Sequence, residues 1–283
     1  MSPFQVLPFV SLALFTFVGA NSLPKVTLSG PPETPGPNRR GVAYNDADYL
    51  KYFSVPGSHV TWTYNWDSRS NVDASAYTGF EFVPMLHSNR PDHTGKWVVD
   101  VWNAAFGNKD LPTHLLGFNE RDNCDAGMGG ACMDLDTAVA AWKQWMEPQK
   151  ALKENMYLGS SAVTNGANGL NYLSSFIDAC TGCNIDFINI HWYDDAANTV
   201  YFKNHVQDAR KVAAGRPIWI TEFRARGSDV QVKAFMDEIL PWLDASGDIH
   251  RYAYFMATKG DGLLIDKGGQ SLSNIGSHFT FHS

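Results

Sequence analysis

The stretch HLLGFNE, residues 114–120, is an apolar run that ends abruptly in an amide and a carboxylate, Asn119 and Glu120. Other runs rich in β-branched and aromatic residues recur along the chain, at 41–45, 60–66, 80–87, 156–163, 187–193, 218–223 and 251–257. They are too uniformly apolar to face water on one side, which favours parallel strands that are covered on both faces. Helical patterns lie between most of these runs, at 134–154, 198–214 and 228–245, and Asp134 is the expected N-cap of the first.

This alternation of strands and helices predicts a single (β/α)8 TIM barrel at residues 39–283. A doubly wound open sheet is the alternative. No glycine-rich fingerprint follows an early strand, so nucleotide binding lacks support. In a (β/α)8 barrel the chemistry lies at the carboxyl ends of the strands, where polar and aromatic residues gather in this sequence.

The N-terminal segments look like targeting and spacer sequences. Residues 1–20 have an apolar core, Val6 to Val18, that is short for a bilayer span, and Gly19-Ala20 follows it. We therefore predict a signal peptide at 1–20 and a secreted, extracellular or cell-wall protein. Residues 21–38 are rich in proline and are predicted to form a linker. No later segment has a transmembrane pattern, so we expect no membrane partner.

The composition limits the partners of the chain. With 44% hydrophobic and 18% charged residues, it is that of an ordinary globular protein. The formal net charge is −7 and no Lys/Arg cluster stands out, so nucleic-acid binding is not expected. The four cysteines suit an oxidising compartment. We expect a monomer.

Only two of the eight predicted strands end on a carboxylate, the fourth with Glu120 and the seventh with Glu222. Strands four and seven lie across the lumen of a barrel, so these side chains are expected to converge. A close carboxylate pair suits glycosidic bond cleavage, in which one acid protonates the leaving oxygen and the other attacks the sugar or activates water. Asn119 would then hold the sugar 2-hydroxyl. The alternative for Glu222 is a salt bridge to Arg224 or Arg226.

Three stretches carry a more specific resemblance. LLGFNERDN (115–123), VTNGANGLNYLSSFIDACTGCNIDFINIHWY (163–193) and IWITEF (218–223) resemble the Asl1-type catalytic domain of glycoside hydrolase family 128, in clan A of the barrel glycosidases. The resemblance implies a retaining β-1,3-glucanase, a type found mostly in fungi, that needs no cofactor. It implies that Glu120 is the acid/base and Glu222 the nucleophile, and that β-1,3-glucan or its oligosaccharides are the binding partner. We expect endo action.

Two arginines depart from the family pattern. Arg121 stands where the family usually has proline, and Arg224 where many members have glycine. A positive charge near Glu120 would lower the pKa of its carboxyl and weaken it as an acid. We expect Arg121 to point away, toward Asp122 or Asp125. The alternative function is a catalytically impaired β-1,3-glucan-binding protein of the same fold.

Other residues at the predicted strand ends are candidates for sugar binding. They are His191, Trp192, Tyr193 and Asn165, with Tyr64, Trp66, His87 and Asn89 on the side of the early strands. Core burial is the alternative for the aromatic rings and for His191. No metal site is expected, because no H-E-x-x-H motif or double C-x-x-C arrangement occurs. No G-x-S-x-G motif occurs, which argues against a serine hydrolase.

The cysteines form two short-range pairs in the sequence. Cys124 and Cys132 flank a glycine-rich loop, and Cys180 and Cys183 form CTGC. A C-x-x-C pair can also be redox-active or half of a zinc site, but structural disulfides are favoured. In the predicted barrel the first pair lies at the catalytic rim and the second at the opposite face, about 20 Å away. The pairing is therefore expected to be Cys124–Cys132 and Cys180–Cys183.

Overall fold

The computed structural model describes residues 39–71, 79–107, 114–152 and 156–282. The predicted signal peptide and proline-rich linker lie outside these residues. Within the described residues, no helix combines the length and apolarity that a membrane crossing requires.

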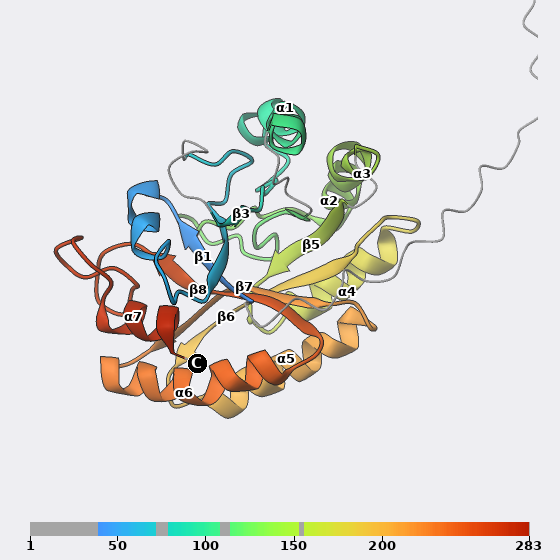
Figure 1. Ribbon diagram of the computed structural model, residues 1–283. Coiled ribbons are helices and arrows are strands. Elements are labelled where there is room, and N and C mark those ends of the chain that lie inside the picture. The colour runs from blue at the N-terminus through green and yellow to red at the C-terminus, as the bar shows by residue number, and fades with distance from the viewer. Residues whose placement is uncertain (1–38, 72–78, 108–113, 153–155, 283) are drawn as a thin grey trace, which may run out of the picture. The chain divides into compact units, whose positions relative to one another are not determined.

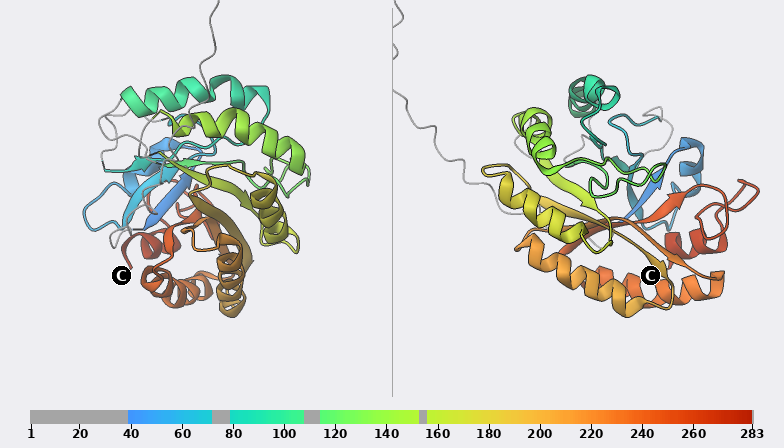
Figure 2. Two further views of the ribbon diagram at one scale, coloured as in Figure 1. Left: turned by 90° about the vertical axis from the view of Figure 1, so that its right-hand side faces the viewer. Right: turned by 180° about the vertical axis from the view of Figure 1, so that it is seen from behind.

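Eight parallel strands form one sheet in the order β3-β2-β1-β8-β7-β6-β5-β4. Their bounds are β1 Arg40–Tyr44, β2 Val60–Tyr64, β3 Glu81–Phe82, β4 His114–Leu116, β5 Tyr157–Val163, β6 Phe187–Asp195, β7 Ile218–Arg226 and β8 Ile249–Ala257. The sheet curls with helices on its outer face (Figures 1 and 2). The two end strands meet through a parallel bridge between Met85 and Leu116, where Leu116 N also donates to the Pro84 carbonyl at 2.9 Å. The predicted (β/α)8 barrel is confirmed.

The helices between the strands vary in length and type. They are α1 Pro91–Gly107, α2 Leu135–Ala141, α3 Glu147–Lys150, α4 Gly169–Ala179, α5 Thr199–Ala213, α6 Asp229–Ala245 and α7 Asn274–Phe281. A 3-10 helix, Ala47–Tyr52, takes the place of the first helix, and a π-helical segment, Trp142–Met146, joins α2 to α3. Capping explains two of the starts. Asp134 accepts from Thr137 N as predicted, and Ser228 forms a capping box with Gln231 before α6.

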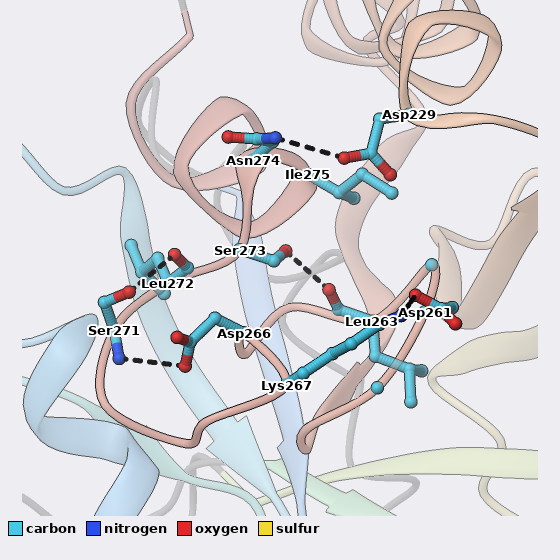
Figure 3. A pocket seen from close by; sticks show the side chains of 12 residues that line it. Asp229, Asp261, Leu263, Asp266, Lys267, Ser271, Leu272, Ser273, Asn274 and Ile275 are labelled. Atoms are coloured by element: carbon cyan, nitrogen blue, oxygen red, sulfur yellow. Dashed lines mark hydrogen bonds and ion pairs between the residues drawn. The ribbon is translucent and has the colours of Figure 1, made fainter.

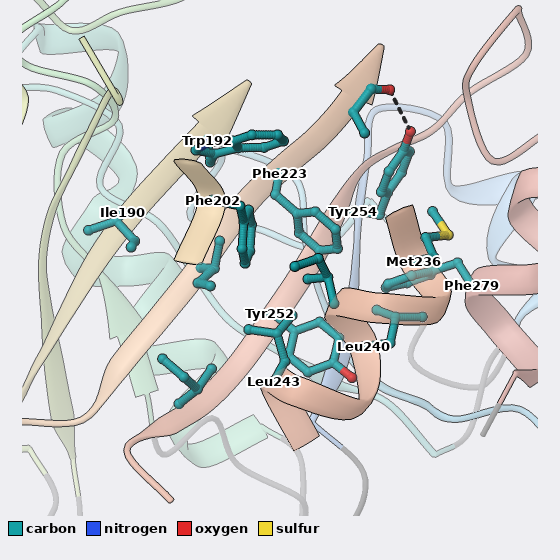
Figure 4. Close-up of a cluster of buried hydrophobic side chains, with 14 of the residues drawn as sticks. Ile190, Trp192, Phe202, Phe223, Met236, Leu240, Leu243, Tyr252, Tyr254 and Phe279 are labelled. Carbon is teal, nitrogen blue, oxygen red and sulfur yellow. Dashed lines mark hydrogen bonds between the residues drawn. The ribbon is translucent and has the colours of Figure 1, made fainter. Parts of the chain in front are cut away.

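The largest apolar core lies between the later strands and helices α5, α6 and α7 (Figure 4). Trp192 belongs to it: its side chain is fully buried, and its ring stacks on Phe235 at a centroid distance of 5.3 Å. The prediction that Trp192 presents a ring face to sugar is therefore wrong. Successive side chains of a strand point to opposite faces, so Trp192 turns toward the helices while its neighbours His191 and Tyr193 turn toward the barrel interior.

Candidate active site

Glu120 and Glu222 converge at the carboxyl ends of the strands, as predicted. Glu222 lies within β7, and Glu120 follows β4 by four residues. Both side chains are buried, and an oxygen of one carboxylate lies within 4.8 Å of an oxygen of the other. The backbone places Glu120 in the left-handed region, with φ of 39°, which a non-glycine residue rarely adopts. A special backbone position thus directs this acid toward its partner.

Hydrogen-bond donors surround the Glu222 carboxylate. Trp66 Nε1 donates to Oε1 at 2.8 Å, and the Tyr64 hydroxyl lies 3.4 Å from the same oxygen. The Tyr193 hydroxyl donates to Oε2. Tyr64 is fixed in turn because its hydroxyl donates to the Thr221 carbonyl at 2.8 Å. The hydrogen bonds from Trp66 and Tyr193 hold the carboxylate in one orientation, which is what a nucleophile requires.

Glu120 has fewer donors, and they lower its pKa. Nδ1 of His191 lies 2.7 Å from Oε1, and Asn123 Nδ2 donates to Oε2 at 2.9 Å. Burial alone would raise the pKa of the Glu120 carboxyl, but the hydrogen bond and charge of His191 and the bond from Asn123 bring it below its usual value. Without substrate, Glu120 is therefore ionised.

His191 stands between the two acids. Strand pairing puts it beside Glu222, and its Nδ1 lies 3.5 Å from Oε2 of that residue. Its Nε2 lies 3.0 Å from Oγ1 of Thr221. Burial would lower the pKa of His191, but the negative charges of Glu222 and Glu120 raise it above its usual value. The imidazole of His191 therefore contacts both carboxylates at once.

Asn119 and His87 present buried polar atoms that no described residue satisfies. Asn119 Nδ2 donates to the Gly129 carbonyl at 3.1 Å, which leaves its Oδ1 buried without a donor among the described residues. His87 Nδ1 is likewise buried and unpaired among them. Burial first, and then the nearby His93, lowers the pKa of His87 to about 4, so the ring is neutral. Both atoms suit contacts with sugar hydroxyls.

One further prediction for sugar binding needs correction. Asn165 is occupied by the protein itself: its Oδ1 accepts from Tyr193 N at 3.0 Å and its Nδ2 donates to the Tyr193 carbonyl at 3.2 Å. It therefore positions Tyr193. Asn89 is exposed just before α1, and its contact with sugar stays a prediction.

Both unusual arginines point away from the catalytic carboxylates. Arg121 is buried with its guanidinium carbon 3.8 Å from the ring centroid of Tyr172 and 4.4 Å from that of Phe176, and it donates to the Tyr172 carbonyl at 2.7 Å. The expectation that it faces Asp122 or Asp125 is corrected, since its bonded partners are on α4. Burial lowers the pKa of Arg121 to about 10, where it is still charged at neutral pH. Arg224 donates to the Asp261 carbonyl at 2.8 Å.

Disulfides join Cys124 to Cys132 and Cys180 to Cys183, which confirms the expected pairing. The first bridge closes the loop that follows Glu120. That loop is tied to the site, because Ala131 N donates to the Asn119 carbonyl at 2.7 Å and Gly129 accepts from the Asn119 side chain.

Sequence reasoning missed three residues that lie near Glu120 and Glu222. Asn123 was the easiest of the three to predict, because it follows Glu120 by three residues. The two residues share a turn, in which the Asn123 N–H donates to the Glu120 carbonyl. Thr221 directly precedes Glu222. Phe255, on β8, packs edge-on against Trp66 and Tyr193, with centroid distances of 5.7 and 5.5 Å. Only the fold brings Phe255 to this site.

A separate pocket of about 310 Å³ lies between β8 and α7 (Figure 3). Polar pairs within its own lining occupy many of its groups: Lys267 bonds Asp261 at 2.9 Å, and Asn274 donates to Asp229 at 3.2 Å. It contains neither catalytic carboxylate, so the chemistry is assigned to the strand ends.

A (β/α)8 barrel with paired glutamates at the ends of its fourth and seventh strands has the architecture of the clan A glycosidases. The family model of the glycosyl hydrolase catalytic core matches residues 41–279, and the chain belongs to this family. Alkali-sensitive linkage protein 1 of Schizosaccharomyces pombe is 30% identical over 249 residues, which cover 84% of this chain and 42% of that protein. The chain thus spans less than half the length of this relative.

Solved structures place the chain with glycoside hydrolase family 128. A curdlan-specific exo-β-1,3-glucanase of subgroup III from Blastomyces gilchristii, solved with glucose, is 34% identical with a TM-score of 0.74, covering 87% of this chain and 98% of that one. A subgroup II endo-β-1,3-glucanase from Sorangium cellulosum is 25% identical with a TM-score of 0.69, covering 85% and 97%. The predicted family is confirmed.

Proposed function

We propose that this protein is a secreted β-1,3-glucanase that cleaves with retention of anomeric configuration. The observation that carries the mechanism is the approach of Glu120 and Glu222 to within 4.8 Å. Retaining glycosidases hold their carboxyl groups about 5–5.5 Å apart, whereas inverting enzymes leave about 6.5–9.5 Å for a water molecule. Family membership and the β-1,3-glucanase relatives support the substrate class.

In the first step Glu222 attacks the anomeric carbon. The bond from that carbon to the glycosidic oxygen breaks, and Glu120 gives its proton to the departing oxygen. In the second step Glu120 takes a proton from water, whose oxygen displaces Glu222 from the same carbon. The donors Trp66 and Tyr193 keep the attacking carboxylate aligned in the first step and stabilise it as it leaves in the second.

His191 supplies the proton that Glu120 needs. In the free enzyme the charges of both glutamates favour the imidazolium form. As Glu222 attacks the sugar, its negative charge is lost while the bond from the anomeric carbon to the glycosidic oxygen breaks, and this weakens the hold of His191 on its proton. In the same step the proton passes from Nδ1 across the 2.7 Å contact to Oε1 of Glu120 as Glu120 protonates the departing oxygen. An acid with a lowered pKa is thereby able to act as a proton donor.

The binding face has polar and aromatic parts. The free Oδ1 of Asn119 and the unpaired Nδ1 of His87 are positioned to bond sugar hydroxyls, and the partly exposed Trp66 and Tyr193 offer aromatic surface beside Glu222. Endo action is the proposed mode. The relatives differ on this point, since one is described as an exo-enzyme and another as an endo-enzyme. A ladder of oligosaccharides from laminarin would support endo action, and a single short product would show exo action.

The alternative, an impaired glucan-binding protein, rested on the two arginines. Arg121 donates to a carbonyl of α4 and Arg224 donates to a carbonyl of the loop after β8, so both guanidinium groups are held away from Glu120. The observation that would favour the alternative is therefore missing from the described site. Secretion is proposed from the first 20 residues and agrees with two closed disulfides.

Laminarin hydrolysis by four proteins tests the function. The wild-type chain is expected to release reducing sugar, and Glu222→Gln to lose turnover while it still binds laminari-oligosaccharides. Glu120→Ala is expected to be slow and to recover in azide with formation of a β-glycosyl azide, because a small anion needs no general base. Glu238→Gln changes an exposed helical carboxylate and serves as the matched control. A wild-type chain that binds but never cleaves would establish the binding protein instead.

A further inference from the structure

A second group of potential metal ligands lies far from the catalytic pair. Asp237 projects from α6, His278 from the last turn of α7, and His282 follows that helix. His278 Nε2 lies 2.7 Å from Oδ1 of Asp237, and His282 Nε2 lies 3.3 Å from the same oxygen. The three ligand atoms are all within 4.8 Å of one another. Helices α6 and α7 pack together on the outside of the barrel (Figure 1).

The spacing of these atoms suits one tetrahedral ion. Zinc binds imidazole nitrogen and carboxylate oxygen at about 2.0–2.2 Å, so two of its tetrahedral ligand atoms are about 3.3–3.6 Å apart. The 3.3 Å from His282 to Asp237 has this spacing, and the 2.7 Å from His278 to Asp237 is shorter. The histidines are four residues apart, and their rings stack with centroids 4.3 Å apart and planes inclined by 17°. Small side-chain adjustments would let both Nε2 atoms and Oδ1 contact the same ion.

We propose that Asp237, His278 and His282 form a binding site for a divalent transition-metal ion of the zinc type. The Asp237 side chain is 53% exposed and His282 36% exposed, so water can supply a fourth ligand. The ion would join α7 to α6. It is structural and not catalytic: Arg40, the first residue of β1, donates to the carbonyls of Phe279 and His282, which places this cluster at the amino-terminal ends of the strands.

Titration of the untagged full chain with zinc chloride tests the site. One equivalent is expected to bind with a rise in Tm of roughly 5–10 °C at a hundredfold excess over Kd. His278→Ala and His282→Ala should each weaken binding at least tenfold, and Co²⁺ should give visible d–d bands that are lost in both variants. His59→Ala, which changes a histidine that contacts α7 through its backbone, should bind as the wild type does.

The catalytic group must be tested separately, because Glu120, His191 and Glu222 also offer three clustered ligand atoms. Glu222→Gln should keep full zinc affinity and the same Tm shift. Loss of binding in Glu222→Gln with retention in His282→Ala would move the ion to the catalytic group and overturn the proposal. Absence of saturable zinc binding in the wild type would overturn it as well. Neither result bears on glucan cleavage, which is measured without added metal.

Discussion

Nδ1 of His191 lies 2.7 Å from Oε1 of Glu120, so the acid is bonded to its own source of protons. Because the pKa of His191 is raised and that of Glu120 is lowered, the alkaline limb of kcat/KM in the wild type should follow the loss of the proton from His191. In His191→Asn the carboxyl of Glu120 must hold the proton alone, and the alkaline limb should move down toward the range of a carboxyl group. The maximal rate should fall on the order of 10²-fold, since the acid loses its alignment. A limb that stays in place or moves upward would contradict this role.

Arg121 stabilises the fold and leaves the acid unaffected. Arg121→Ala removes a buried side chain that stacks on Tyr172 and Phe176, and it should cost about 2–4 kcal/mol of unfolding free energy. The alkaline limb of the pH–rate profile of Arg121→Ala should match that of the wild type. Thermal melts and a pH–rate profile measure both effects. The exposed Arg90→Ala is the control and should cost below about 1 kcal/mol. A displaced limb in Arg121→Ala would show that its charge reaches Glu120.

Tyr193 acts on the nucleophile through its hydroxyl. Tyr193→Phe removes the donor to Oε2 of Glu222 and should lower kcat on the order of 10²-fold, with a smaller change in KM. Asn165→Ala frees the Tyr193 backbone and should shift kcat in the same direction by less. Tyr201→Phe loses the two hydrogen bonds between the Tyr201 hydroxyl and Asn165 but keeps both bonds between Asn165 and Tyr193, so it should stay close to the wild type. Equal activity in Tyr193→Phe and the wild type would remove this role.

The two disulfides should differ in their importance for activity. The bridge between Cys124 and Cys132 braces the loop that accepts from Asn119, whereas Cys180 and Cys183 follow α4 just before β6 begins. Replacing the first pair by serine should reduce kcat/KM more than replacing the second. Kinetics on both double variants, with circular dichroism to confirm folding, measure the difference. A larger loss from the second pair would contradict the placement of the first at the active site.

Strand pattern and strand ends made the barrel and its two acids predictable. Parallel strands end at one rim, so Glu120 and Glu222 could be placed together although 102 residues separate them. The error at Trp192 was avoidable, since alternation along β6 cannot turn both His191 and Trp192 inward. The partners of Arg121 and Asn165 could not be predicted, because Tyr172 and Tyr193 reach them only through the packing of α4 and the curl of the sheet.

The configuration of the first product tests the central claim, retention by Glu222 and Glu120. Wild-type enzyme and a laminari-oligosaccharide are mixed in an NMR tube, and the anomeric protons are followed from the first minutes, before mutarotation. Two displacements at the same carbon give the β-anomer first, and the α-anomer appears only later. An α-anomer that forms first would show a single displacement by water and would contradict the account.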